Sequence, residues 1–189
     1  MFRIPVDPTL DLVLLEPRHA GMLFAVVDEN RAHLRRWLPW VDATRGVSDS
    51  AAYIHATLGQ FARSEALTVG IFTQGALAGC IGYHPIDWMS RRAALGYWLA
   101  SSFQGRGLMT RAARAMTTHA FVALGLHRME IRAGVENKRS RQVAERAGFQ
   151  FEGVSRGSEW LHDRFIDHAV YGALAPEWQL APREPRAAT

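Results

Sequence analysis

The chain has 189 residues, of which 48% are hydrophobic, and its formal net charge at pH 7 is +4. This length suits one domain with a substantial core, and the apolar content excludes a disordered or low-complexity chain. The longest apolar runs, such as residues 12–15 and 23–27, are far shorter than a membrane span, and no secretory signal is recognisable. Cys80 is the only cysteine, so we expect no intramolecular disulfide and a soluble, cytoplasmic protein.

Almost all of the positive charge comes from arginine, because Lys138 is the only lysine. The arginines are scattered, with short pairs only at 35–36 and 91–92. We therefore expect solvated faces with one anion site, and no direct nucleic-acid partner. A domain that binds anions or nucleic acid through arginines is the alternative.

Apolar periodicity and turn residues predict seven strands and four helices. In chain order they are a strand at 10–15, a helix at 18–41, a helix capped by Ser48 or Asp49, strands at 66–72, 77–83 and 91–100, a helix at 108–124, a strand at 127–135, a helix at 137–147, and strands at 149–160 and 164–174. This order predicts an α/β domain built around one mixed sheet. We expect it to cover residues 1–181, with a loose tail at 182–189.

A glycine-rich stretch, Gln104-Gly105-Arg106-Gly107-Leu108-Met109-Thr110, lies between a predicted strand and a predicted helix. Its glycines let the backbone turn tightly and approach a ligand, and the helix N-terminus directs N–H groups and its dipole at an anion such as pyrophosphate. Arg106 and Arg111 would add charge. The alternative is a turn that merely links the two elements. No Walker A pattern follows, and a Rossmann fingerprint fits poorly because the third glycine is missing.

This stretch resembles the acyl-CoA-binding loop of the GNAT superfamily, Gln/Arg-x-x-Gly-x-Gly/Ala. Gln104 and Gly107 match the pattern, and Met109 stands where Gly or Ala is usual. The segments 96–99, 135–149, 152–154 and 167–171 resemble the ribosomal-protein alanine and serine N-acetyltransferase (RimJ/RimL-like) branch in the same order. The resemblance spans about residues 8–179 and is specific for the family, but weak for the substrate.

The resemblance implies a GNAT fold whose fourth and fifth strands splay apart to hold acetyl-CoA, which gives its acetyl group directly to an amine. The acceptor would be a ribosomal protein or peptide N-terminus; a small-molecule amine or antibiotic, or a module that binds acyl-CoA without turnover, are alternatives. A homodimer is expected by analogy. The implied cofactor-binding residues are Leu99, Ala100, Ser101, Gln104, Gly105, Arg106, Gly107, Leu108, Met109, Thr110 and Asn137.

Amine acetylation needs a base and an acid. The resemblance implies that Glu159 is the base, although Glu159 could instead make a structural ion pair. It also implies that Ser140 donates a proton to the departing sulfur, with Tyr171 as a substitute. Asn137 and Ser140 also stand where a helix N-terminus is expected, so capping is the alternative for both.

Two aromatic residues, Trp37 and Trp40, border the acceptor pocket in the resembling branch, although packing at a helix–helix corner is equally compatible. Four residues could suggest a metal site: His162, Asp163, Asp167 and His168. Their spacing matches no zinc motif, so we expect no metal. Cys80 lies in an apolar strand, which makes it a poor candidate nucleophile.

Overall fold

A computed structural model describes residues 2–178. The predicted tail at 182–189 lies outside these residues. The sheet has the strand order β1-β2-β3-β4-β5-β6-β8-β7. The strands are β1 Arg3–Asp7, β2 Leu10–Leu14, β3 Leu67–Thr73, β4 Ala76–Tyr83, β5 Arg92–Leu99, β6 Arg128–Gly134, β7 Gln150–Leu161 and β8 Arg164–Leu174. The helices are α1 Ala20–Glu29, α2 Arg31–Leu34, α3 Val47–Ala62, α4 Leu108–Val122 and α5 Lys138–Ala147. The mixed α/β architecture confirms the predicted fold class.

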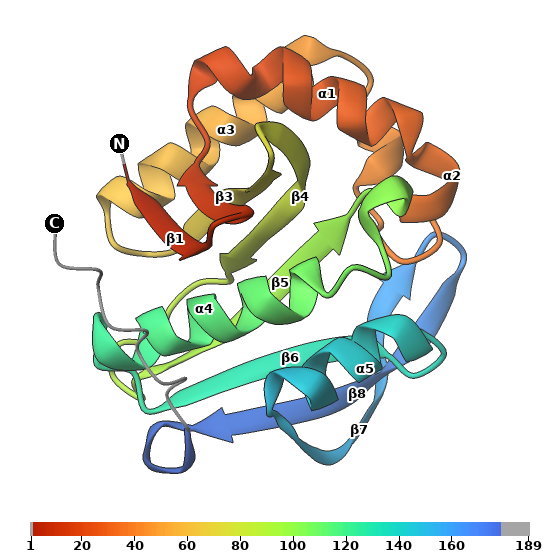
Figure 1. The fold of residues 1–189 in the computed structure, drawn as a ribbon. Coiled ribbons are helices and arrows are strands. Elements are labelled where there is room, and N and C mark those ends of the chain that lie inside the picture. Colours follow the sequence, from red (N-terminus) through yellow and green to blue (C-terminus); the bar gives the residue numbers. More distant parts are fainter. Residues whose placement is uncertain (1, 179–189) are drawn as a thin grey trace, which may run out of the picture.

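Helices cover both faces of the sheet (Figure 1). On β4, Cys80 packs with α1 and α3, whereas its neighbour Ile81 belongs to the cluster that includes α4. Because successive side chains of a strand point to opposite faces, the two helix layers lie on opposite sides. In the described residues, no helix combines the length and the apolar character needed to cross a membrane.

Strands β5 and β6 run parallel but pair over only part of their length. Their register extends from Arg92 opposite Arg128 to Leu95 opposite Ile131, although the strands continue to Leu99 and Gly134. Figure 1 shows them diverging toward these ends. The predicted splay is confirmed, and it falls between the fifth and sixth strands of the chain because β1 was not predicted.

Three sequence predictions of local structure are wrong. The single helix expected at 18–41 is interrupted at Asn30, whose side-chain oxygen accepts bonds from the Ser101 N–H and hydroxyl, both at 2.9 Å. The N-cap of α3 is Gly46, where Ser48 or Asp49 was expected. Asp49 lies at the third helical position and accepts the Gly46 N–H at 3.0 Å. The third difference is the additional strand β1.

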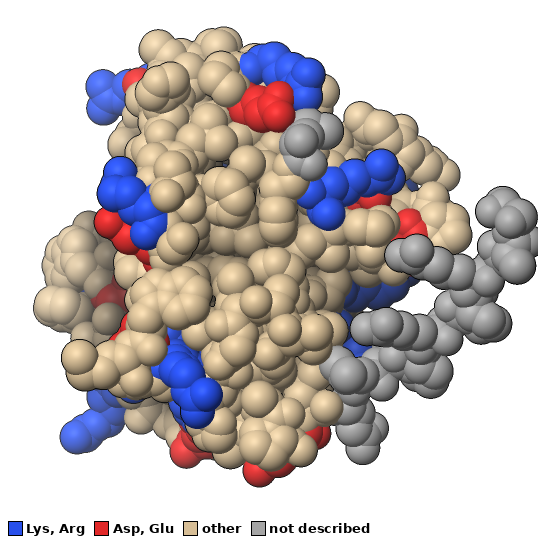
Figure 2. All heavy atoms as spheres, turned by 90° about the vertical axis from the view of Figure 1, so that its left-hand side faces the viewer, with Lys and Arg blue, Asp and Glu red and all other residues tan. Residues whose placement is uncertain are grey.

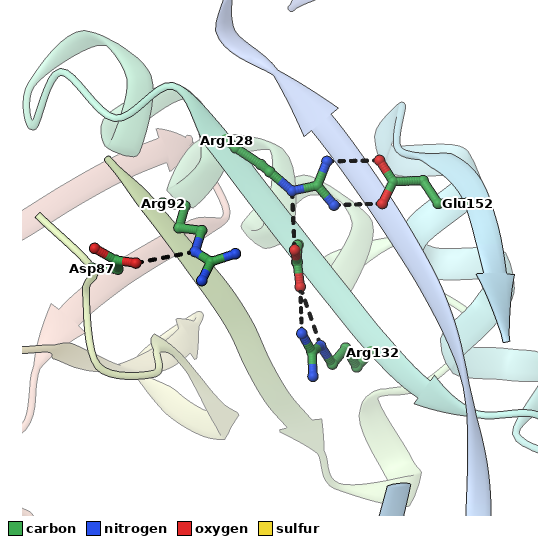
Figure 3. A network of polar contacts seen from close by, with 6 residues as sticks. Asp87, Arg92, Arg128, Arg132 and Glu152 are labelled. Carbon is green, nitrogen blue, oxygen red and sulfur yellow. Dashed lines mark hydrogen bonds and ion pairs between the residues drawn. The ribbon is translucent and has the colours of Figure 1, made fainter. Parts of the chain in front are cut away.

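The charged side chains are mixed in sign. On the face drawn in Figure 2, basic and acidic groups are scattered among uncharged ones. Figure 3 shows a second place where acidic and basic side chains alternate. Arg128 donates a hydrogen bond to Glu152, and Arg132 extends the same network along β6. Between the two arginines lies Glu130. Burial acts to raise the pKa of Glu130, but hydrogen bonds from Arg132 and Arg128 hold it below its usual value. Much of the arginine charge is therefore compensated locally.

Candidate active site

A cleft of about 1580 Å³ opens where β5 and β6 diverge. Its walls include α3, the segments around α2, the start of α4, the start of α5 and the β7–β8 hairpin. Most of the predicted site residues line it: Trp37, Trp40, Leu99, Ser101, Gln104, Gly105, Gly107, Leu108, Met109, Thr110, Asn137, Ser140 and Glu159. Of the predicted residues, Ala100 and Arg106 are not part of its lining. The fold thus brings one predicted set of residues from four separate segments into one space.

The glycine-rich loop has the backbone that its sequence predicted. Gly105 and Gly107 adopt left-handed φ values of 75° and 71°. In the described part of the chain, a Cβ added to either would have no heavy atom within 4 Å. Gly107 is the N-cap of α4 and has no side chain that could cover the first N–H groups of the helix. The loop therefore presents open space and unshielded donors to the cleft.

Arg111 was predicted to add positive charge to the anion site beside this loop. That prediction is wrong, because Arg111 forms an ion pair with Asp7 on β1: its Nε lies 3.0 Å from Asp7 Oδ2, without hydrogen-bond geometry. Arg106 lies over the Phe103 ring, with 5.7 Å between the guanidinium carbon and the centroid. Arg139 of α5 instead lines the cleft.

Gln104 connects the loop to two helices. Its amide nitrogen lies 2.7 Å from His33 Nε2 on α2, and its amide oxygen accepts a hydrogen bond from Arg139 Nη1 on α5. Burial lowers the pKa of His33, and the neighbouring Arg139 and Arg36 lower it further, while a bond with the Leu99 backbone opposes them. The Gln104 side chain therefore links the glycine-rich loop to both α2 and α5.

Ser140 and Asn137 have the capping geometry that the sequence left open. Asn137 is the N-cap of α5, and its side-chain oxygen accepts the Ser140 N–H at 3.2 Å. The Ser140 hydroxyl remains available and lies 3.1 Å from Tyr97 Oη on β5. Burial raises the pKa of Tyr97 to about 12, so this phenol is protonated at neutral pH. Sequence reasoning missed Tyr97, because only packing brings β5 against α5.

Tyr171, the substitute acid, lies outside the cleft lining. It is fully buried on β8, its hydroxyl donates to Glu145 Oε1 at 2.9 Å, and Arg141 Nε donates to that hydroxyl at 3.0 Å. The Tyr171 hydroxyl is therefore hydrogen-bonded to two side chains of α5 and does not line the cleft. The prediction of Tyr171 as the substitute acid is wrong.

Glu159 lies on β7 and lines the cleft with its side chain half-buried. Its Oε2 is 3.1 Å from His168 Nε2 on β8. His84, at the end of β4, lines the same part of the cleft. Burial and Arg132 lower the pKa of His84, whereas Glu159 acts in the opposite direction. No local motif pointed to His84 or to the Glu159–His168 contact, because both depend on strand register.

Three tryptophans are among the aromatic residues of the lining. Trp37 and Trp40 follow α2, and Trp98 comes from β5. The rings of Trp40 and Trp98 have centroids 6.1 Å apart. Trp40 is partly exposed at the cleft, so this segment both packs and faces the open space.

The residues considered for metal binding and nucleophilic chemistry have other partners. Within residues 2–178, no three His, Cys, Asp or Glu side chains are grouped so as to hold a metal ion. His162 Nε2 lies 2.7 Å from the Arg35 carbonyl oxygen, and Asp167 binds a backbone N–H of β7. Cys80 is buried, and burial raises the pKa of its thiol to about 12, which opposes thiolate formation.

Comparisons with known proteins agree with this arrangement. A model described as "Acetyltransferase (GNAT) domain" matches residues 9–150. YdaF of Bacillus subtilis (strain 168), named "Putative ribosomal N-acetyltransferase", is 33% identical, covering 95% of this chain and 98% of its own. The ribosomal-protein-serine acetyltransferase of Escherichia coli (strain K12) is 29% identical, covering 90% of this chain and 96% of its own. The solved structure of RimL, a ribosomal L7/L12 α-N-protein acetyltransferase in complex with coenzyme A, has a TM-score of 0.88 at 29% identity, covering 92% and 98% of the two chains. The chain belongs to the GNAT family of acetyltransferases.

Proposed function

We propose that this protein transfers the acetyl group of acetyl-CoA to the α-amine of a protein N-terminus, with a ribosomal protein as acceptor. One observation carries the proposal. The glycine-rich loop, the Ser140 hydroxyl and the Glu159 carboxylate all face one continuous cleft at the gap between β5 and β6. The ribosomal acceptor is taken from the names of the relatives.

The loop suits a pyrophosphate on physical grounds. Its two left-handed glycines leave space that a side chain would fill, and the N–H groups at the start of α4 favour an anion. Arg139 adds a positive charge beside them. We assign the pyrophosphate to residues 104–110, and the pantetheine arm to the gap beside Leu99, Ser101 and Asn137. Arg106 was predicted to add charge beside the loop and Ala100 to contribute to the cofactor site, and neither residue is part of the cleft lining.

Acetyl-CoA supplies an electrophilic thioester carbonyl carbon and a thiolate leaving group. Glu159 accepts the proton that the acceptor nitrogen loses once it bonds to that carbon. A carboxylate can do this, directly or through a water molecule, because the nitrogen becomes strongly acidic in the tetrahedral intermediate. The Ser140 hydroxyl donates a proton to the leaving sulfur. The protonated Tyr97 hydroxyl, at 3.1 Å, can then return a proton to Ser140.

The ionisation of amines supports an α-amine acceptor. An α-amino group has a pKa of about 7.7–8.0 and a lysine side chain about 10.4. At pH 7 roughly a tenth of the α-amine is already neutral, whereas lysine would need a shift of about three units, or about 4 kcal/mol. Glu159 is one candidate carboxylate, and the aromatic segment of Trp37 and Trp40 suits a short, exposed chain end.

Paired peptides test the proposal. One peptide has a free N-terminus and no lysine, and the other has a blocked N-terminus and a single lysine. With acetyl-CoA and mass spectrometry as the readout, we expect faster modification of the free N-terminus. Faster modification of the blocked lysine peptide would refute the α-amine assignment, and reaction of neither would redirect the assignment to small-molecule amines.

Ribosomal proteins and acetyl-CoA meet in the cytoplasm, so we assign the protein to that compartment; the single cysteine is compatible with it. A homodimer remains a prediction by analogy, and sedimentation equilibrium of the full chain measures it directly.

A further inference from the structure

The segment that carries Glu159 departs from regular strand pairing. Ser155 of β7 lies opposite His168 of β8, but Glu159 lies opposite Ile166. Four steps along β7 therefore match two steps along β8. A regular register would bring Gly157 opposite Ile166, and Glu159 two residues further along, opposite Arg164. At about 3.3 Å per residue, the bulge moves Glu159 by roughly 7 Å from the hairpin tip toward the cleft.

The strand register also shows which face of the sheet Glu159 occupies. Residues paired across an antiparallel ladder point to the same face of the sheet. Glu159 therefore shares a face with Ile166 and, two residues along β8, with His168. All three line the cleft. Because the bulge adds two residues, it leaves Glu159 on this face and moves the carboxylate along the strand toward His168.

Asp167 holds this bulge. Its Oδ1 accepts the Gly157 N–H at 2.8 Å, where Gly157 has a left-handed φ of 56°. The Asp167 carbonyl oxygen accepts the Val135 N–H at 2.9 Å, which connects β8 to the chain directly after β6. One residue therefore ties the bulge to the strand that borders the gap.

His168 contacts the carboxylate itself. Its Nε2 lies 3.1 Å from Glu159 Oε2, and its side chain is 15% exposed. In the register of β6 and β8 it lies opposite Gly134, the last residue of β6. A hydrogen bond of this kind restricts the orientation of the carboxylate.

We propose that Asp167 and His168 are the positioning residues of Glu159: Asp167 fixes the bulge that moves Glu159 along β7 to the level of His168, and His168 fixes the carboxylate by a hydrogen bond from Nε2. The inference rests on the proposed function only in treating Glu159 as the base. It assigns a purpose to the adjacent pair that sequence reasoning weighed, and set aside, as metal ligands.

Kinetics of five variants test the role of His168. His168→Ala should lower kcat about 10- to 100-fold with little change in KM for acetyl-CoA, because a displaced base slows the chemical step. His168→Gln keeps a nitrogen donor and should retain kcat within about threefold. In a Glu159→Gln background, His168→Ala should cause no further loss, because the two residues act as a unit. His162→Ala is the control on the same hairpin, and it should stay within about twofold.

The role of Asp167 has a readout that needs no activity. Amide hydrogen exchange at Gly157 should accelerate at least about tenfold in Asp167→Ala. Asp167→Asn keeps an oxygen acceptor and should preserve the protection. Crystal structures of Asp167→Ala and His168→Ala should show Glu159 turned away from its position in the native cleft. A Glu159 side chain that keeps its place in both variants would overturn the proposal, as would additive losses in the Glu159→Gln background.

These measurements separate the two ideas. If Glu159→Gln retains full activity, or if the native protein acetylates no amine, the proposed function fails. The exchange and crystallographic results then decide the positioning of Glu159 without reference to turnover.

Discussion

Gly107 offers a direct test of the cofactor loop, because its backbone cost can be separated from its role in binding. Its φ is 71°, and a residue with a Cβ loses about 1–2 kcal/mol in that conformation. Gly125, beyond the other end of α4, has a φ of 65°, and an added Cβ there would also meet no described heavy atom within 4 Å. Substitution of either glycine by Ala or Trp should therefore cost similar stability. In a chain of this size we expect the Tm to fall by about 2–4 °C per kcal/mol.

Only the Gly107 variants should weaken the binding of acetyl-CoA. A tryptophan at 107 fills the space in front of the first N–H groups of α4. A hydrogen bond to a charged group contributes about 1.5–3 kcal/mol, so the loss of two raises Kd by a factor of at least about 10². Gly107→Trp should thus abolish measurable binding, whereas Gly125→Trp should bind as the native protein does.

Isothermal titration calorimetry with acetyl-CoA measures the affinity of each variant, and thermal unfolding measures its stability. A folded Gly107→Trp protein with undiminished affinity would refute the placement of the pyrophosphate on this loop. Equal losses of affinity in the Gly107 and Gly125 variants would show that general destabilisation, and not the loop, controls binding.

Further predictions concern the catalytic groups and the pH dependence of stability. Glu159→Gln should lower turnover by about 10² or more with acetyl-CoA affinity nearly unchanged, since it keeps the shape and removes the base; activity within about twofold of native across the pH range would contradict this. Ser140→Ala should slow transfer by at least about tenfold, and Tyr97→Phe should slow it less, because the serine hydroxyl remains; equal rates for native and Ser140→Ala proteins would remove serine as the acid. Burial lowers the pKa of His33 and His119 below 6.5, so the unfolded chain takes up these protons first. The free energy of unfolding should therefore fall as pH drops below about 6.5, by up to about 1.4 kcal/mol per pH unit for each such histidine; urea unfolding that is unchanged between pH 7.5 and 5.5 would disprove it.

Local signals were sufficient where a residue's role depends on its neighbours in sequence. The hairpin at β3 and β4, Gly148 at the end of α5, and the Asn137 cap all lie where turn and capping rules predict them. These rules describe short-range hydrogen bonds and backbone angles, which the sequence specifies directly.

Tertiary contacts account for what the sequence could not reveal. The helix expected at 18–41 breaks at Asn30 because its side chain binds Ser101, 71 residues later. Arg111 was assigned to the anion site, but it pairs with Asp7 on β1, the strand that was not predicted. The missed strand thus caused the error at Arg111, since the partner of Arg111 was unknown without it. The role of Tyr97 was also not predicted, because its contact with Ser140, 43 residues later, depends on tertiary packing.

The structure also explains the one departure from the family's loop pattern. Gly105 and Gly107 have the left-handed angles that require glycine, whereas Met109 is the second residue of α4 and has ordinary helical geometry. Its side chain is 6% exposed and belongs to the main hydrophobic core. A methionine at this position therefore changes the packing beneath the helix and leaves its backbone N–H at the N-terminus. The departure therefore removes no group that the loop needs to bind a pyrophosphate.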